Sequence, residues 1–140
     1  MQKALVLLVI MWSCIACNEK VASADLQNLN GYWEIEEVTF PNGDTKDYKV
    51  NATIDYIKID KNKGFRKKVQ PKFDGTYKTS DDAAAFSITE KDAVFLIHYK
   101  NGLNEWSEQL VSVSKNDFSV RTEDGVMYKY KRFTPIQVTD

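Results

Sequence analysis

The chain has 140 residues, and its 19 basic and 20 acidic side chains give a formal net charge of −1. This balance excludes a protein held to nucleic acid by general electrostatic attraction, which needs an excess of Lys and Arg. The two cysteines, Cys14 and Cys17, both stand near the amino terminus, so no disulfide framework can hold the rest of the chain, whose fold must depend on its core alone.

The first 16 residues have the pattern of a cleaved secretory signal peptide. Lys3 supplies a positive charge, and residues 4–12 form an apolar run much shorter than the roughly 20 residues of a spanning helix. Ala16, Cys17 and the polar residues after them resemble a bacterial lipoprotein signal, in which the cysteine becomes the first residue and is lipidated. The resemblance implies lipidation at Cys17 and a membrane-anchored position in the cell envelope, expected at the outer membrane.

Two alternatives to this signal stay open. Cys14 stands where such signals usually carry Leu, and it could itself be the modified residue. An ordinary cleaved signal that contains cysteines by chance would export the protein without an anchor.

Residues 17–28 are small and polar, and we expect them to form a tether between the anchor and a folded domain. The domain is expected at residues 29–133, a usual size for a single domain, followed by a short carboxy-terminal tail at 134–140.

Turn signals recur at fairly regular intervals along the expected domain, and several contain Asn-Gly or Asp-Gly, which tolerate the positive φ of tight hairpins. The runs between them are rich in Val, Ile, Thr and aromatic residues, as strands are. A further short strand is expected at 45–50. The main strands are expected at 32–40, 53–60, 65–70, 75–79, 85–89, 93–100, 105–114, 118–122 and 126–133.

Apolar and polar residues alternate in several of these runs, for example at 118–122 and 126–133, which is typical of strands with one wet face. No part of the domain has a convincing helical period. Short antiparallel strands of this kind form a closed barrel or a sandwich. Because the links are hairpins and a barrel leaves no exposed edges, we predict an all-β, antiparallel up-and-down barrel of about 8–10 strands.

Two ends of the domain carry a matched pair of residues. Gly31-Tyr32-Trp33 opens the first strand, and Arg132 stands late in the last. A guanidinium stacks well on an indole, and Gly31 lets a neighbouring group approach the ring. This arrangement resembles the Gly-x-Trp start and late basic residue of lipocalins and related calycin barrels, most closely the short lipocalin-like lipoproteins of Bacteroidetes-type bacteria.

The resemblance implies a lipocalin-like barrel closed by Gly31, Trp33 and Arg132, with a structural role for Trp33; the alternative for Trp33 is a plain core aromatic. It also implies that the barrel binds a small, mainly apolar molecule through burial of apolar area. Aromatic strand residues are the candidates for lining such a pocket. The ligand-binding candidates are Tyr56, Phe95, Tyr128 and Tyr130, with His98 at the rim.

Residues for catalysis are not recognisable in the sequence. His98 is the sole histidine and has no acid or nucleophile placed beside it by any motif. Cysteine and histidine do not recur with metal-ligand spacing, and phosphate-binding glycine loops are absent. We therefore expect a protein that is not an enzyme, with no cofactor and no metal.

Residues 58–72 contain seven basic side chains and one acid. One interpretation is a surface that meets an anionic partner through Arg66, Lys67 and Lys68, such as lipid headgroups or acidic glycans. The other is a solvated hairpin whose lysines discourage edge pairing. The alternative to a ligand carrier is accordingly a filled barrel that acts as a surface interaction or inhibitor module for a protein, a glycan or an anionic partner.

Overall fold

The computed structural model describes residues 20–135. The expected signal peptide, the lipidation site at Cys17 and the tail after residue 135 lie outside the described residues. Within residues 20–135, no helix has the length and hydropathy that crossing a bilayer requires.

Nine antiparallel strands form one sheet, in which consecutive strands of the chain pair with each other except for the second and third, which both pair with the first. This order follows from the short turns, which leave no room for a cross-connection. The strands are β1 (Gly31–Thr39), β2 (Thr45–Asp47), β3 (Ile54–Asp60), β4 (Lys63–Pro71), β5 (Tyr77–Lys91), β6 (Val94–Asn101), β7 (Asn104–Val113), β8 (Asp117–Thr122) and β9 (Met127–Arg132).

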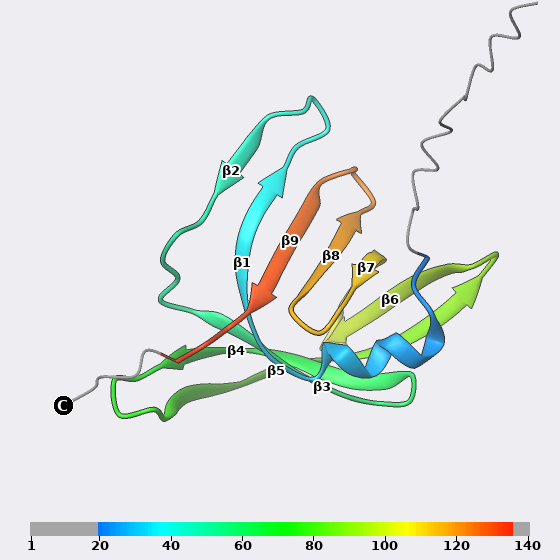
Figure 1. The fold of residues 1–140 in the computed structure, drawn as a ribbon. Helices are drawn as coiled ribbons and strands as arrows, with labels where there is room; N and C mark the ends of the chain where they lie inside the picture. Colours follow the sequence, from blue (N-terminus) through cyan, green and yellow to red (C-terminus); the bar gives the residue numbers. More distant parts are fainter. Residues whose placement is uncertain (1–19, 136–140) are drawn as a thin grey trace, which may run out of the picture.

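The sheet closes on itself because β1 pairs with β9 along one edge and with β3 along the other. Eight strands, β1 and β3 to β9, therefore make the barrel. Strand β2 pairs only with the end of β1 and lies outside the ring, as Figure 1 shows. The prediction of an all-β, antiparallel up-and-down barrel is confirmed.

Strand β5 differs from the sequence-based expectation. It is one strand of 15 residues, so the prediction of two strands at 75–79 and 85–89 with a turn between them is wrong. Thr79 pairs with Val69 and Ala83 with Lys67, so the polar residues 80–82 stand opposite Lys68 alone. A bulge absorbs the turn-forming residues without ending the strand, and its irregular, charged edge also discourages pairing with another chain.

The segment before β1 also differs. Residues 23–28, expected to be part of a tether, belong to the 3-10 helix η1 (Ser23–Leu29). Its side chains Leu26 and Leu29 are 5% and 1% exposed and join the barrel core. A single short helix shows too few turns for a periodic signal, so only the burial of these two leucines reveals it. Helix η1 contacts β3 and β7 and thereby covers one end of the barrel.

The barrel interior is filled over most of its depth. Inward-facing side chains of alternate strand positions pack into one continuous core with the helix leucines. Asp55 is the one polar or charged residue among residues 20–135 that is buried, at 3% exposure. The core consists of Leu26, Leu29, Trp33, Ile57, Ile59, Ala84, Phe86, Ile88, Phe95, Ile97, Tyr99, Leu110, Phe118, Val120 and Tyr130.

Candidate functional site

The end of the barrel beneath η1 is sealed by Trp33 and Arg132, which are cross-strand partners in β1 and β9. The indole is fully buried and its Nε1 donates to the carbonyl of Leu29 at 2.8 Å. The Arg132 guanidinium carbon lies 3.8 Å from the ring centroid. Gly31 has φ +123°, and a Cβ at this position would overlap Nη1 of Arg132. The sequence thus places a glycine where the arginine must pass.

Arg132 also satisfies backbone groups at this end. Its guanidinium donates to the carbonyls of Asn30, Asn28 and Lys115, which lie just before β1, in η1 and in the β7–β8 turn. One side chain therefore ties three segments together, and a planar fork with five donors is the group that can do so.

The opposite end of the barrel is hollowed. A pocket of about 260 Å³, called the mouth site below, opens between strands β3 to β7. Its walls combine charged side chains with two aromatic rings, a mixed lining that suits a polar small molecule. The mouth site is lined by Asp55, Arg66, Lys67, Lys68, Asp82, Ala84, Tyr99, Asn101, Trp106 and Glu108.

Asp55 holds two cations at the floor of the mouth site. Its Oδ1 accepts from Arg66 Nε at 3.1 Å, and Lys68 Nζ lies 2.8 Å from the same oxygen. Burial by itself would raise the pKa of Asp55, but the charges and hydrogen bonds of Arg66 and Lys68 outweigh it and lower the pKa below the usual aspartate value. Asp55 is thus ionised and fully engaged.

Arg66 connects this ion pair to two tyrosines. Its Nη1 donates to Tyr99 Oη at 3.3 Å, and its guanidinium lies 4.9 Å from the ring centroid of Tyr130. Burial raises the pKa of Tyr99 to about 12, so its hydroxyl keeps its proton at neutral pH. A guanidinium held by a carboxylate, a phenol and a ring face is fixed in position before any ligand arrives.

Glu108 is the incompletely satisfied group of the mouth site. Its Oε2 lies 3.8 Å from Arg66 Nη1, beyond hydrogen-bond distance, and this buried oxygen has no hydrogen-bond partner within residues 20–135. Burial raises the pKa of Glu108 above the usual glutamate value despite the attraction of Arg66. An unpartnered buried oxygen costs about 1–3 kcal/mol, so a ligand that supplies a donor here recovers binding energy.

Trp106 forms an aromatic wall at the lip of the mouth site. It stacks on Tyr99 with ring centroids 5.1 Å apart and an interplanar angle of 12°. Because Trp106 is still 42% exposed, it offers an apolar surface to an incoming molecule.

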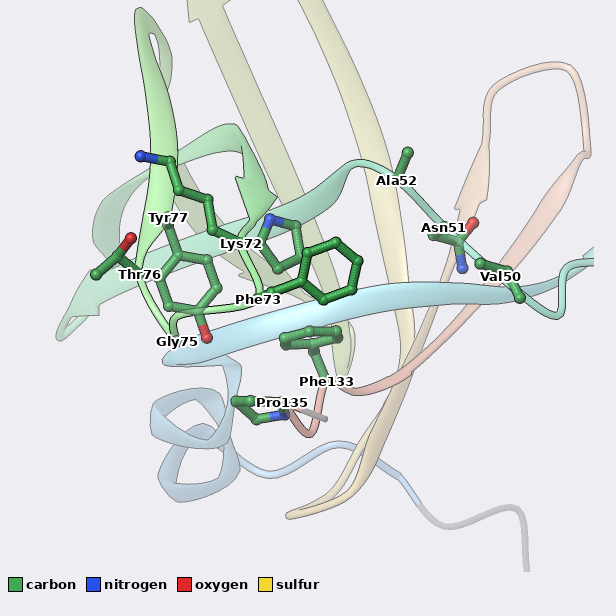
Figure 2. Close-up of a pocket in the computed structure, with 11 residues that line it drawn as sticks. Val50, Asn51, Ala52, Lys72, Phe73, Gly75, Thr76, Tyr77, Phe133 and Pro135 are labelled. Carbon is green, nitrogen blue, oxygen red and sulfur yellow. The ribbon is translucent and has the colours of Figure 1, made fainter. Parts of the chain in front are cut away.

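A second hollow lies on the outside of the barrel. This outer groove has a volume of about 220 Å³ and a largely apolar wall, with Phe73, Tyr77, Phe133 and Pro135 arranged around it in Figure 2. It lies between the β4–β5 turn, the segment before β3 and the segment after β9. Its lining consists of Val50, Asn51, Ala52, Pro71, Lys72, Phe73, Gly75, Thr76, Tyr77, Phe133 and Pro135.

The structure separates the ligand-binding candidates that the sequence suggested. Phe95 and Tyr130 belong to the filled core, and Tyr128 packs partly buried against it. Tyr56 lies on the outer face of the barrel, tilted against Tyr32. Of these residues, Tyr130 reaches the mouth site indirectly, through Arg66.

His98 also faces outward. The neighbouring positions Ile97 and Tyr99 point into the core, so strand alternation turns His98 away from the lumen. Its ring nitrogens lie 2.9 Å from Thr89 Oγ1 and 2.8 Å from Ser107 Oγ, across both neighbouring strands. Within residues 20–135, no group of three or more His, Cys, Asp or Glu side chains is placed to hold a metal ion.

Sequence reasoning missed the charged set in the mouth site. Asp55 shares a strand face with Ile57 and Ile59, so an acid on an otherwise apolar face was the available signal. Arg66 was grouped with Lys67 and Lys68 as an anionic contact, yet its side chain points into the barrel toward Asp55.

Comparison with known proteins identifies a family model and solved structures to which the chain is similar. A family model described as a lipocalin-like domain matches residues 29–120. Among solved structures, a lipocalin-like protein from Bacteroides uniformis is 14% identical with a TM-score of 0.47, covering 76% of this chain and 99% of that one. A protein from Bacteroides eggerthii is 12% identical with a TM-score of 0.47, covering 75% and 99%. The comparison with curated proteins gives no match.

Proposed function

Since the chain belongs to the lipocalin-like domain family, we propose that it is an exported, lipid-anchored protein that binds a small molecule at the mouth site. The observation that carries the proposal is the buried Glu108 oxygen, which has no hydrogen-bond partner in the described part of the chain and lies in a pocket of about 260 Å³ beside a fixed guanidinium. The volume of the pocket lies just below the roughly 300–1,000 Å³ of typical ligand sites, so the ligand is small.

The position of the ligand follows from the filled core. An eight-stranded barrel either fills with side chains or holds one small ligand. Here the core occupies the depth of the barrel from η1 upward, and the mouth site is the hollow at its other end. The bound molecule would therefore lie near the rim instead of deep in the lumen.

The chemistry of the lining suggests what the ligand carries. An apolar ring would lie against Trp106, which is already backed by Tyr99. A hydroxyl, amide or amine hydrogen would donate to Glu108 Oε2. The mainly apolar ligand expected from the sequence thus gains one polar group that fixes its orientation.

We propose binding without catalysis. His98, the sole histidine of the chain, lies on the outer face, where its two ring nitrogens meet two hydroxyls, whereas the histidine of a catalytic triad meets one nucleophile and one carboxylate. Around the mouth site, Asp55 and Arg66 are engaged with each other, an arrangement that supports fixed recognition.

Native mass spectrometry of the full chain isolated from its own host tests the binding proposal. We expect a co-purifying small molecule that is lost in Trp106→Ala and in Glu108→Met, which removes the acceptor oxygen. Leu103→Ala is the matched control, because Leu103 is fully exposed on the neighbouring β6–β7 turn and does not line the mouth site. Retention of the molecule in both mouth-site variants would overturn the proposal.

The anchor is tested separately. Cys17→Ser should move the protein from the membrane fraction to the soluble fraction, while Cys14→Ser should leave it in the membrane. The reverse pattern would assign the lipid to Cys14. Unchanged fractionation of both variants would contradict lipidation.

The filled core also favours the alternative of a surface interaction module. Most of the interior is occupied by side chains, so the outer face has to be considered as a binding surface. Of the three basic residues expected to meet an anionic partner, Arg66 is turned inward, whereas Lys68 remains exposed.

A further inference from the structure

Five aromatic rings follow one another across the outside of the barrel. Ring centroids are 5.9 Å apart for Phe65 and Tyr56, 4.8 Å for Tyr56 and Tyr32, 4.2 Å for Tyr32 and Tyr77, and 6.4 Å for Tyr77 and Phe133. All five are half-buried. A series of aromatic residues on the outer face of a barrel is unexpected where water alone covers it, since outward positions are normally polar. We call these five residues the aromatic stripe.

The aromatic stripe ends at the outer groove, where two apolar side chains stand free. Phe73 is 94% exposed in the β4–β5 turn, and Val50 is 91% exposed in the segment before β3. Both line the groove together with Tyr77 and Phe133 of the stripe (Figure 2). The groove, the stripe and the free side chains thus form one continuous apolar surface with a protruding tip.

Lysine side chains border this surface. Residues 63–79 contain six basic side chains and one acid, Asp74. The carboxylate of Asp74 is engaged in the turn itself, where it accepts from the backbone and hydroxyl of Thr76 at 2.9 and 2.6 Å. Arg66 is inside the barrel, whereas exposed Lys72 lines the groove next to Phe73, and exposed Lys58 is the cross-strand neighbour of Phe65.

We propose that the outer groove and the aromatic stripe dock onto the surface of an anionic lipid bilayer. Phe73 and Val50 enter the interfacial region, and the tyrosines lie at headgroup depth, where a ring with a polar tip is most favourable. Lys58 and Lys72 meet the anionic headgroups, while their aliphatic stems cover apolar surface.

A bilayer fits this surface better than a single partner molecule does. Phe73, the most exposed apolar group of this surface, projects from a turn tip, so it is shaped to enter a soft layer, whereas a groove that receives a peptide hides its apolar side chains in its walls. The positive rim matches a negative surface potential. This inference does not depend on the mouth site, whose variants leave the groove intact.

The test places a fluorophore at the turn tip. The full chain carries Cys14→Ser and Cys17→Ser, so that Phe73→Cys supplies the sole thiol for an environment-sensitive dye. A matched chain carries the dye at Leu103→Cys, on a different turn with equal exposure. With vesicles containing about 30% phosphatidylglycerol in phosphatidylcholine, we expect the emission at position 73 to shift to shorter wavelength and the emission at position 103 to stay unchanged.

Charge-reversal variants test whether the lysines contribute to binding at the anionic bilayer. Lys58→Glu with Lys72→Glu should weaken the response at position 73 about tenfold or more, because each lysine near an anionic surface contributes to attachment. Lys91→Glu with Lys115→Glu changes the net charge equally at exposed positions away from the groove and should leave the response intact. Melting curves of each variant confirm that the fold persists.

Three results would overturn the proposal. They are an equal response at positions 73 and 103, an equal response on vesicles of phosphatidylcholine alone, and a response to soluble short-chain phosphatidylglycerol without vesicles. The last result would assign the groove to a single lipid molecule. Because the dye reports on position 73 alone, none of these results bears on ligand binding at the mouth site.

Discussion

The two ends of the barrel are built on different chemistry. At the end beneath η1, Trp33 is fully buried, its Nε1 has a partner, and Arg132 closes the seam with donors to three backbone carbonyls. At the mouth, Asp55 and Arg66 form a buried ion pair beside a glutamate oxygen that has no hydrogen-bond partner within residues 20–135. The donors of Trp33 and Arg132 at the sealed end have acceptors, whereas the mouth site keeps a buried oxygen without a donor among the described residues.

This difference indicates how the fold divides stability from binding. Packed apolar groups and satisfied donors stabilise without further partners, whereas buried ions nearly balance attraction against the loss of hydration. A binding site needs polar groups that can hydrogen-bond to a ligand, and in the ligand-free protein such groups lower the free energy of unfolding. Because these groups lie at the end opposite the seal, their destabilising effect is confined to that region of the barrel.

The largest loss of stability should come from replacing Trp33, and replacing Trp106 should cost much less. Trp33→Ala should lower the free energy of unfolding by about 3–5 kcal/mol, because it empties the sealed end. Trp106→Ala, at a position 42% exposed, should cost less than about 1 kcal/mol. Urea unfolding of both variants measures the difference, and equal losses would contradict the division between the ends.

The second largest loss of stability should come from replacing Arg66, the cation that pairs with Asp55 in the mouth site. Arg66→Met should lower the free energy of unfolding by about 3 kcal/mol, since it leaves Asp55 buried with Lys68 as its remaining partner. In the double variant Arg66→Met with Asp55→Asn, a large part of this loss should return. If the double variant is as unstable as the sum of the single ones, the two residues act independently and the ion-pair account fails.

The seam residue should have a smaller effect. Arg132→Ala should cost about 1–3 kcal/mol through lost stacking on Trp33 and lost donors. Arg132→Lys should recover a minor part, because an ammonium cannot reproduce the planar fork. An unchanged melting midpoint in Arg132→Ala would show that the seam does not need this contact.

The smallest expected effect is the contribution of Glu108 to the pH dependence of the free energy of unfolding. Its pKa is raised by burial, so ionisation is harder in the folded state, and the protein loses stability as the pH rises from the usual glutamate range, about pH 4, through the raised pKa. Glu108→Gln should remove that loss, and its stability relative to the original protein should therefore improve with rising pH. Unfolding free energies measured across this range would show parallel curves if Glu108 titrates normally.

Local signals predicted much of this architecture. The alternation of apolar and polar residues, with Asn-Gly and Asp-Gly turns, predicted strands close to those observed, and Gly31, Trp33 and Arg132 lie together in the structure. The bulge at residues 80–82 escaped prediction because its polar residues carry the same composition as a turn. Helix η1 escaped because two buried leucines in a polar segment do not make a period.

The sequence by itself determined the strand period and the residues able to close a barrel, because both are local properties of side-chain type and spacing. Only the tertiary structure decided which charges meet. Strand register sets Ile57 beside Arg66 and Ile97 beside Glu108, and barrel curvature then turns Asp55, Arg66 and Glu108 toward one another across the lumen. Those contacts depend on the pairing of five strands, which no single segment encodes.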